Sequence, residues 1–143
     1  MAKISKLLGT AEDTEAAFYD AISRADLDTL MSLWADEEDI YCIHPGASRL
    51  VGHAAIRASF SSIFEHGSIH IQPRRLRVIQ NMMTSVHNVV EEISQANEQH
   101  QDIHILATNI YMKTAQGWRI VAHHASVGPG SLNSEQSSGT MLH

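Results

Sequence analysis

The feature that most constrains the fold is a change of hydrophobic period at Gly67, which divides the chain into two unlike halves. Before this glycine, apolar residues recur about every 3.6 positions, as they do on one face of a helix. After it, they alternate at every second position, as they do on one face of a strand. Helices followed by a run of antiparallel strands are typical of an α+β domain.

Three helices are predicted in the first half. The first begins at about Ala11, with acidic residues in its first turn, where the helix dipole favours negative charge. The second follows Asp26, a good N-cap, and carries Trp34 in a broad apolar stripe. The third runs from about His53 to His66, and the glycine that follows is well placed to stop it.

A short strand is predicted from Ile40 to His44, because Pro45 cannot donate a hydrogen bond to a strand ladder. The apolar residues lie at odd positions before Pro73 (Ile69 and Ile71) and at even positions after it (Leu76 and Val78), which predicts a bulge or bend there. Three later strands exceed the usual length of ~5–6 residues, and strands that long curl. We therefore expect the three helices to pack on a strongly curved, mostly antiparallel sheet that forms a cone. The long strands are predicted at about Thr84–Ala96, Ile103–Thr114 and Trp118–Val127, with turns at Asn97–Gln101 and Ala115–Gly117.

Composition excludes several classes of function. Sixteen acidic and ten basic residues give a net charge of −6, so no basic field is available for nucleic acid or an anionic membrane. No apolar run reaches the ~18 residues of a membrane span. The first residues lack the apolar core of a signal peptide, which predicts a cytoplasmic protein. The single cysteine, Cys42, excludes an internal disulfide and a multi-cysteine metal cluster.

The length of 143 residues suits one folded domain. Weak patterning predicts an N-terminal arm at 1–10, loosely docked or mobile, before the cone domain at 11–127. The remaining residues, 128–143, are rich in Gly, Ser and other polar types, which predicts a flexible C-terminal tail.

Four stretches carry a resemblance to a known family: RADLDTLMSLWADEED, HPG, GHAAIR and GWRIVAHHAS. Together they resemble the nuclear transport factor 2-like superfamily, in its SnoaL-like, ketosteroid isomerase-related branch, over residues 11–127. The resemblance implies a cone-shaped fold with a deep apolar pocket, and often a homodimer formed through the sheet. It does not imply one function, because this fold hosts isomerases, dehydratases, cyclases, epoxide hydrolases and non-catalytic modules.

The resemblance also marks positions of interest. The ketosteroid isomerases place a catalytic aspartate directly before the proline that ends the first strand, and His44 stands there. Their oxyanion-stabilising tyrosine corresponds to Phe18, which has no hydroxyl group, while Tyr19 is the next residue along the helix. Their second, protonated carboxylic acid has no match, and Asn109 and Tyr111 are the polar candidates on that strand. The aspartate–arginine–aspartate set of the epoxide hydrolases is absent, and these departures argue against steroid isomerisation as such.

His44 is the candidate catalytic residue. Its ordinary pKa of ~6.5 lets an imidazole accept a proton near neutral pH and act as a general base. The alternative is a structural histidine that hydrogen-bonds the following loop and orders the HPG turn. Phe18 and Trp34 lie at core spacing, so they either pack the core or line the pocket.

The last strand carries two adjacent histidines, His123 and His124, which strict alternation places on opposite faces. We predict that His123 faces the pocket, and the reverse arrangement stays open. Alternation also groups His124 with Trp118. Cys42 and His44 share a face, but side chains two apart on a strand lie ~6–7 Å apart, so we expect buried packing rather than a Cys–His pair. A metal would need His44, one further histidine and a carboxylate, and neither a metal nor a cofactor is predicted.

The sequence therefore predicts a homodimeric protein that binds an apolar small molecule. It could catalyse cofactor-free isomerisation, dehydration or cyclisation of a polyketide-like or steroid-like compound. The alternative is a non-catalytic ligand-binding or dimerisation module of the same fold. In the first case His44 is the base, and the binding residues are Phe18, Tyr19, Trp34, Asn109 and His123.

Overall fold

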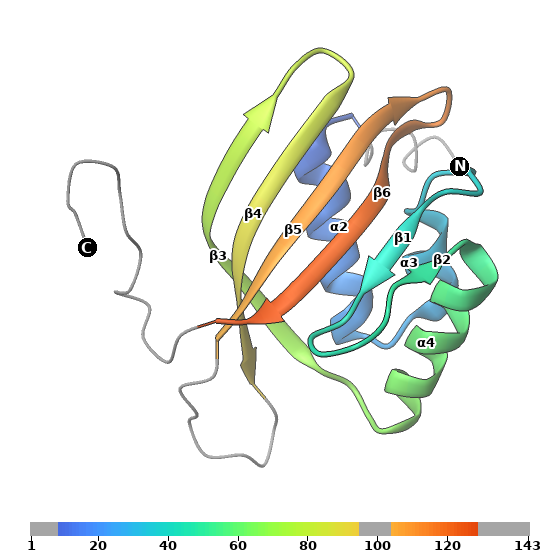
Figure 1. Cartoon of the computed structure of the whole chain (residues 1–143), viewed down its shortest axis with the longest axis vertical. Coiled ribbons are helices and arrows are strands. Elements are labelled where there is room, and N and C mark those ends of the chain that lie inside the picture. The colour runs from blue at the N-terminus through green and yellow to red at the C-terminus, as the bar shows by residue number, and fades with distance from the viewer. Residues whose placement is uncertain (1–8, 95–103, 129–143) are drawn as a thin grey trace.

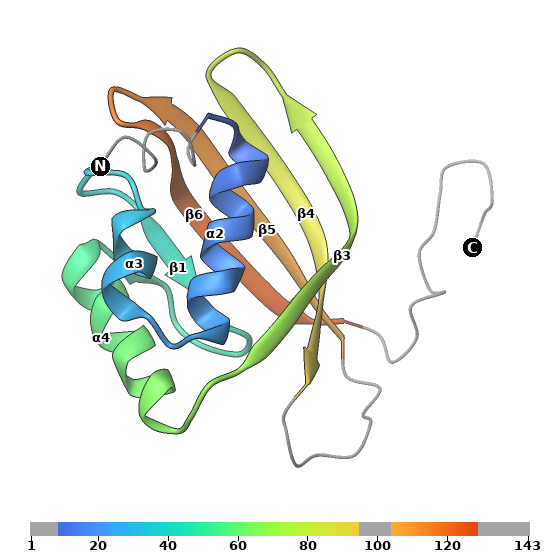
Figure 2. The same cartoon turned by 180° about the vertical axis from the view of Figure 1, so that it is seen from behind.

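Three helices cover one face of a curved, six-stranded sheet in the computed structural model, which describes residues 9–94 and 104–128. Figure 1 looks onto the face of the long strands without helices, and Figure 2 shows α2 crossing the opposite face. The predicted α+β architecture is confirmed. The elements are α2 (Ala11–Ser23), α3 (Leu27–Ser32), β1 (Tyr41–Ile43), β2 (Leu50–Val51), α4 (His53–Glu65), β3 (His70–Gln80), β4 (Thr84–Ser94), β5 (His104–Thr114) and β6 (Gly117–Val127).

The strand order is β2-β1-β6-β5-β4-β3, so the sheet is open at both edges. β1 runs parallel to β6, and the other neighbours are antiparallel. Sequence analysis missed β2, because two residues are too few to show a period. β1 ends one residue earlier than predicted, so His44 lies just past the strand and its side chain is not fixed by the ladder.

Side-chain caps fix where two helices begin. The hydroxyl of Thr10 accepts a hydrogen bond from the Asp13 amide at the start of α2, and Asp26 accepts one from Thr29 at the start of α3. α3 is shorter than its apolar stripe, because the chain leaves the helix to pair with β6. Ile120 donates its amide to the Leu33 carbonyl and accepts from the Ala35 amide, both at 2.8 Å.

A bulge bends β3 away from a regular ladder. Register with β4 shifts between Arg74 and Arg77, and Arg75 has a positive φ of 55°. The bulge thus begins after Arg74, next to Pro73, in agreement with the change of apolar alternation in the sequence. It allows the long edge strand to curve around the helix side of the sheet (Figure 2).

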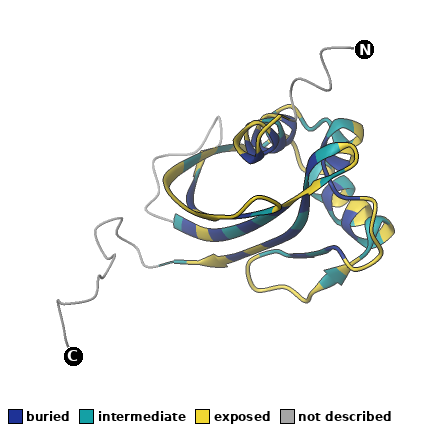
Figure 3. Cartoon of the chain, turned by 90° about the horizontal axis from the view of Figure 1, so that it is seen from above, coloured by how far each residue is buried: buried dark blue, intermediate teal, exposed yellow. Residues whose placement is uncertain are grey.

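A second bulge, in β6, was not predicted. Ile110 pairs with Ala122, whereas the next residue, Tyr111, pairs with Ile120, so Val121 is an extra residue. The extra residue reverses the alternation beyond it. His123 therefore shares the inner face with Ile120, and the prediction that grouped His124 with Trp118 is wrong. His123 is buried and His124 is exposed. Figure 3 shows buried and exposed stretches alternating along strands of the sheet.

The core lies between α2 and the inner face of β4, β5 and β6. Phe18 is at its centre, with its ring centroid 6.2 Å from that of Phe60 and 6.5 Å from that of Trp34. No helix in the described part of the chain is long and apolar enough to cross a membrane. The predicted turn at 97–101 lies outside the described residues, as do all of the arm except 9–10 and all of the tail except Gly128.

Candidate functional site

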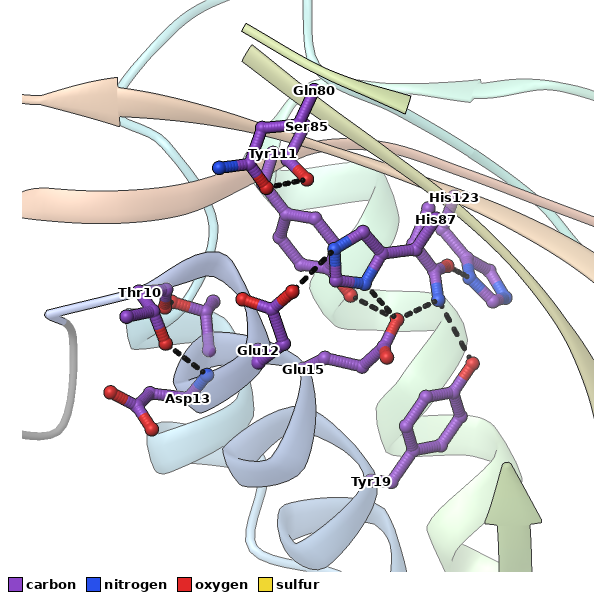
Figure 4. Close-up of polar contacts among 12 residues, drawn as sticks. Thr10, Glu12, Asp13, Glu15, Tyr19, Gln80, Ser85, His87, Tyr111 and His123 are labelled. Atoms are coloured by element: carbon purple, nitrogen blue, oxygen red, sulfur yellow. Dashed lines mark hydrogen bonds and ion pairs between the residues drawn. The ribbon is translucent and has the colours of Figure 1, made fainter. Parts of the chain in front are cut away.

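A connected group of buried polar side chains runs through this core, from α2 to β6 (Figure 4). The packing of α2 against three strands brings the group together, because alternate residues of each strand point to the same face. We call it the inner polar network. Its members are Glu15 and Tyr19 on α2, His87 and Glu91 on β4, Asn109 and Tyr111 on β5, and His123 on β6; all seven are buried.

Glu15 anchors one end of the network. Its Oε2 accepts hydrogen bonds from Tyr111 Oη at 2.8 Å and from Asn109 Nδ2 at 3.2 Å. His87 Nδ1 lies 3.1 Å from the same oxygen, an ion-pair distance when His87 is protonated, although the angle does not fit a hydrogen bond. Burial alone would raise the pKa of Glu15, but the imidazole of His87 and the two donors outweigh it and lower that pKa. The carboxyl group is therefore held as a carboxylate.

His87 sits between two carboxylates of α2. Its side chain is fully buried, and its Nε2 lies 3.8 Å from Glu12 Oε2 on the exposed side of the helix. Neither ring nitrogen has a well-aligned hydrogen-bond partner among the described residues. Glu12 and Glu15 therefore approach the His87 ring closely without forming well-aligned hydrogen bonds to it.

Asn109 connects the two halves of the network. Its Nδ2 donates to Glu15 and, at 3.0 Å, to Tyr19 Oη, so its Oδ1 is left to accept. That oxygen lies 2.5 Å from His123 Nδ1. Because an amide oxygen carries no proton, His123 must donate from Nδ1, and its Nε2 keeps a free lone pair. Burial, helped by the nearby histidines, lowers the pKa of His123 to about 3, so the ring is neutral at neutral pH.

Glu91 forms the third branch. Tyr19 Oη donates to Glu91 Oε2 at 2.7 Å while it accepts from Asn109. Burial and then the negative charge of Glu15 raise the pKa of Glu91 to about 7, against the lowering effect of the tyrosine donor. A carboxyl group poised near neutral pH can take up or release a proton there. Burial and the Glu91 charge also raise the pKa of Tyr19, which keeps its proton.

His44 lies near this network at the more exposed side of the core. Its ring is half-buried, with its centroid 5.1 Å from that of Phe60 and 6.5 Å from that of His123. Burial lowers the pKa of His44, so the ring is uncharged at neutral pH. Its Nε2 lies 3.8 Å from Cys42 Sγ, closer than predicted, because His44 has left the strand and is free to turn toward the sulfur. Burial raises the pKa of Cys42 to about 12, which keeps it a thiol.

The structure brings the predicted site residues into one region. Phe18 contacts Tyr19 and His123, with ring centroids 5.1 and 5.5 Å apart. Asn109 hydrogen-bonds both of these polar residues, and Trp34 adjoins the region through Phe18. His44 adjoins it through the His123 ring.

Sequence reasoning missed Glu15, His87 and Glu91. The signals were present in the periodicity, though. Glu15 precedes Phe18 and Tyr19 by three and four residues, which places a carboxylate on the buried face of α2. His87 and Glu91 share their parity with buried Val89, so alternation alone would have placed both side chains inside.

A separate hollow lies on the opposite face of the sheet, where no helix covers it. Its volume is 750 Å³, and we call it the outer hollow. His44 is not among the residues that line it. In the described ranges no group of three or more His, Cys, Asp or Glu side chains could hold a metal ion. The outer hollow is lined by Ala35, Asp36, Glu37, Asp39, Ile40, Tyr41, Ile110, Met112, Lys113, Thr114, Ala115, Gln116, Val121 and Ala122.

Comparison with solved structures finds the same fold in several bacteria. A Thiobacillus denitrificans structure, provisionally described as a calcium/calmodulin-dependent protein kinase type II association domain, is 36% identical with a TM-score of 0.79; the match covers 85% of this chain and 98% of that one. A Streptomyces avermitilis structure, provisionally described as a dehydratase of the NTF2-like family, is 28% identical with a TM-score of 0.73, covering 81% and 91%. An NTF2-like protein of unknown function from Pseudomonas putida KT2440 is 15% identical, also with a TM-score of 0.73, covering 88% and 89%, and supports the fold alone.

Comparison with curated proteins finds no match. The SnoaL-like domain family, in contrast, matches residues 12–129, which is most of the chain. The match spans every helix and strand from α2 to β6 except the first residue of α2. Together with the open, curved sheet and its three helices, this shows that the chain belongs to the SnoaL-like domain family.

Proposed function

We propose that this protein binds an apolar small molecule beside His44 and carries out cofactor-free acid–base chemistry on it. The observation that carries the proposal is the inner polar network, with His44 next to it. Perturbed ionisable groups gathered in an apolar core are more typical of functional sites than of structural cores. The exposed side of the half-buried His44 ring gives a ligand its access.

Each group has a role that its surroundings support. His44 is uncharged at neutral pH, so it can accept a proton from carbon or oxygen of the ligand. His123 presents a free Nε2 lone pair, and Tyr19 and Asn109 steer an oxygen of the ligand through the network. Glu91, with its pKa of about 7, holds or releases the balancing proton. Phe18 and Trp34 form the apolar wall behind these groups.

This set of groups suits a reaction that moves a proton and consumes no other reagent. Removal of a proton next to a carbonyl group, followed by its return elsewhere, is an isomerisation; loss of water or ring closure from the same intermediate gives dehydration or cyclisation. The S. avermitilis neighbour, provisionally described as a dehydratase, is 28% identical, which supports this class of reaction. A polyketide-like or steroid-like ketone fits the apolar surroundings. The cytoplasmic location is part of the same proposal.

The proposal is tested with a panel of polycyclic ketones and hydroxyketones. A ligand that binds only the native state raises the melting temperature. At a ligand concentration of a hundred times its Kd, the free energy of unfolding increases by about 2.7 kcal/mol. Exchange of the ligand's α-proton in D₂O, followed by NMR, then reports proton abstraction. We expect His44→Gln to slow this exchange by about 10²–10⁴-fold.

The matched control is His124→Gln, because His124 is an exposed histidine on the outer face of the same sheet. It should leave both binding and exchange unchanged. Equal loss in the two variants, or exchange that persists in His44→Gln, would remove His44 from the mechanism. If no ketone in the panel shifts the melting temperature or exchanges its proton, the result supports the non-catalytic alternative instead.

A second candidate function is assembly, as a dimerisation module. Two observations favour it: the relative described as an association domain is 36% identical, and the helix-free sheet face carries apolar side chains. Pairing of β4 with β5 places Val90 beside Leu106 on that face, and neither residue lines the outer hollow. Such a face would bury its apolar area in a homodimer that packs sheet on sheet.

We expect the wild-type chain to sediment as a dimer and Leu106→Glu to sediment as a monomer, because a carboxylate on that face would be desolvated without a partner. Met82→Glu is the control, since Met82 is 86% exposed in the turn between β3 and β4, off the face. Sedimentation velocity distinguishes the two. A wild-type monomer would rule out this assembly, and a Leu106→Glu dimer would place its interface elsewhere.

A further inference from the structure

We propose that the chain's own N-terminal segment, residues 1–8, docks in the outer hollow. The hollow lies against the helix-free side of β1, β6 and β5, at the end where the β5–β6 hairpin turns. The outer hollow is separated from the inner polar network by the sheet, because the network lies on the opposite face. The proposal does not depend on the proposed acid–base chemistry.

The floor of the outer hollow is apolar. Ile110 and Ala122 are neighbours across the β5–β6 ladder and point away from α2, since Asn109 and His123 beside them point toward it. Met112, also in the lining, is 44% exposed. Apolar side chains placed here would be removed from water, which is the main source of binding free energy at such a surface.

The rim of the outer hollow is acidic. Asp36, Glu37 and Asp39, from the loop between α3 and β1, line it, and Lys113 is the one basic residue in the lining. An apolar floor under a negative rim suits a segment that carries both apolar and positively charged side chains. Isolated surface ion pairs contribute little, so the charges set orientation while the apolar contacts hold the segment.

Residues 1–8, MAKISKLL, have this composition in a chain whose net charge is −6. Lys3 and Lys6 supply positive charge, and the segment has no acidic residue. Ile4, Leu7 and Leu8 supply apolar side chains next to those lysines. By contrast, the other terminal stretch, 129–143, has no lysine or arginine at all.

The segment also joins the described chain near the hollow. Thr14 Oγ1 donates to the Trp118 carbonyl at 2.9 Å, so the first turn of α2 sits against the start of β6. Trp118 in turn pairs with Lys113, which lines the outer hollow. Eight extended residues span at most roughly 26–29 Å, which sets the reach of the segment from Gly9.

A spin label tests this docking on the full chain. Ser5→Cys provides the only reactive thiol, because Cys42 is fully buried with its pKa raised to about 12. We expect a nitroxide at residue 5 to broaden away the methyl NMR signals of Met112 and Ile110. The methyl signal of Ile71, at the far end of the sheet, should keep its intensity.

Charge reversal supplies the matched variants. Lys3→Glu with Lys6→Glu should restore the Met112 signal in the labelled protein, and adding Asp36→Lys with Glu37→Lys should broaden it again. These positions are exposed or lie in the segment itself, so folding is unaffected, and the unchanged spectrum of the core verifies this.

Two results would overturn the proposal. Full intensity at Met112 and Ile110 in the labelled wild-type background would show that the segment does not occupy the hollow. Broadening of the Met112 signal in methyl-labelled protein without a spin label, on mixing with spin-labelled, isotopically unlabelled protein, would show that the occupant is a second copy of the chain.

Discussion

Glu15→Leu is expected to lower the free energy of unfolding by about 3–5 kcal/mol, one of the largest losses that any single substitution on α2 should cause. The variant removes the acceptor shared by Tyr111 and Asn109 and leaves His87 fully buried with no carboxylate inside the core. A buried donor without an acceptor bears its whole desolvation cost. Urea unfolding followed by circular dichroism measures the change.

Two further variants separate this explanation from simple loss of packing. Glu12→Leu removes a carboxylate of the same helix that is half-exposed and only 3.8 Å from His87, so it should change stability by no more than about 0.5 kcal/mol. Glu15→Leu combined with His87→Leu and Tyr111→Phe should recover most of the loss, because an apolar set can replace a buried polar one. If Glu15→Leu unfolds at the wild-type urea concentration, the network contributes nothing to the fold.

Glu91 should make the protein less stable as the pH rises from 4.5 to about 7. Its pKa is raised from 4.5 to about 7 in the folded state, so between these values the folded protein holds a proton that the unfolded chain has released. Stability from this group is fully present below pH 4.5, falls as the pH rises from 4.5 to 7, and is gone once the pH has passed through 7. At about 1.4 kcal/mol per pKa unit, the loss amounts to about 3 kcal/mol.

Glu91→Gln isolates this effect. Glutamine keeps an oxygen that can accept from Tyr19 Oη but does not ionise. The stability of the variant relative to wild type should therefore increase by about 3 kcal/mol between pH 4.5 and pH 8. His123 has the opposite dependence, since its lowered pKa destabilises the fold as the pH falls, but it is present in both proteins and cancels in the difference. A difference that stays constant with pH would mean that Glu91 ionises normally.

The sequence was sufficient to predict the architecture, because the evidence for it is periodic and repeated. The change of period at Gly67, the cap at Asp26 and the proline after His44 each act locally, and the structure follows them. Helix ends were less predictable. α3 stops at Ser32 because Leu33 and Ala35 pair with Ile120, a contact between residues far apart in the sequence.

The candidate site was only partly predictable for a similar reason. Its aromatic and histidine members stood out as residue types, whereas Glu15 and Glu91 looked like two of many acidic residues in an acidic chain. Only the packing of α2 on β4 shows that their carboxyl groups are buried and that Tyr19 joins Glu91 to Asn109. The closeness of Cys42 to His44 likewise depends on a backbone that leaves the ladder at Ile43.

The bulge at Val121 has a consequence for how such a protein could change during evolution. A single extra residue decides that the imidazole of His123 is shielded from solvent and that of His124 is hydrated. If the strand kept Val121 but lost the bulge, strict alternation from Ile120 would turn His124 inward in place of His123, with no new side chain introduced. Deletion of Val121 would instead restore regular alternation and leave His123 inside, so the interior of such a strand depends on the bulge and not on its length alone.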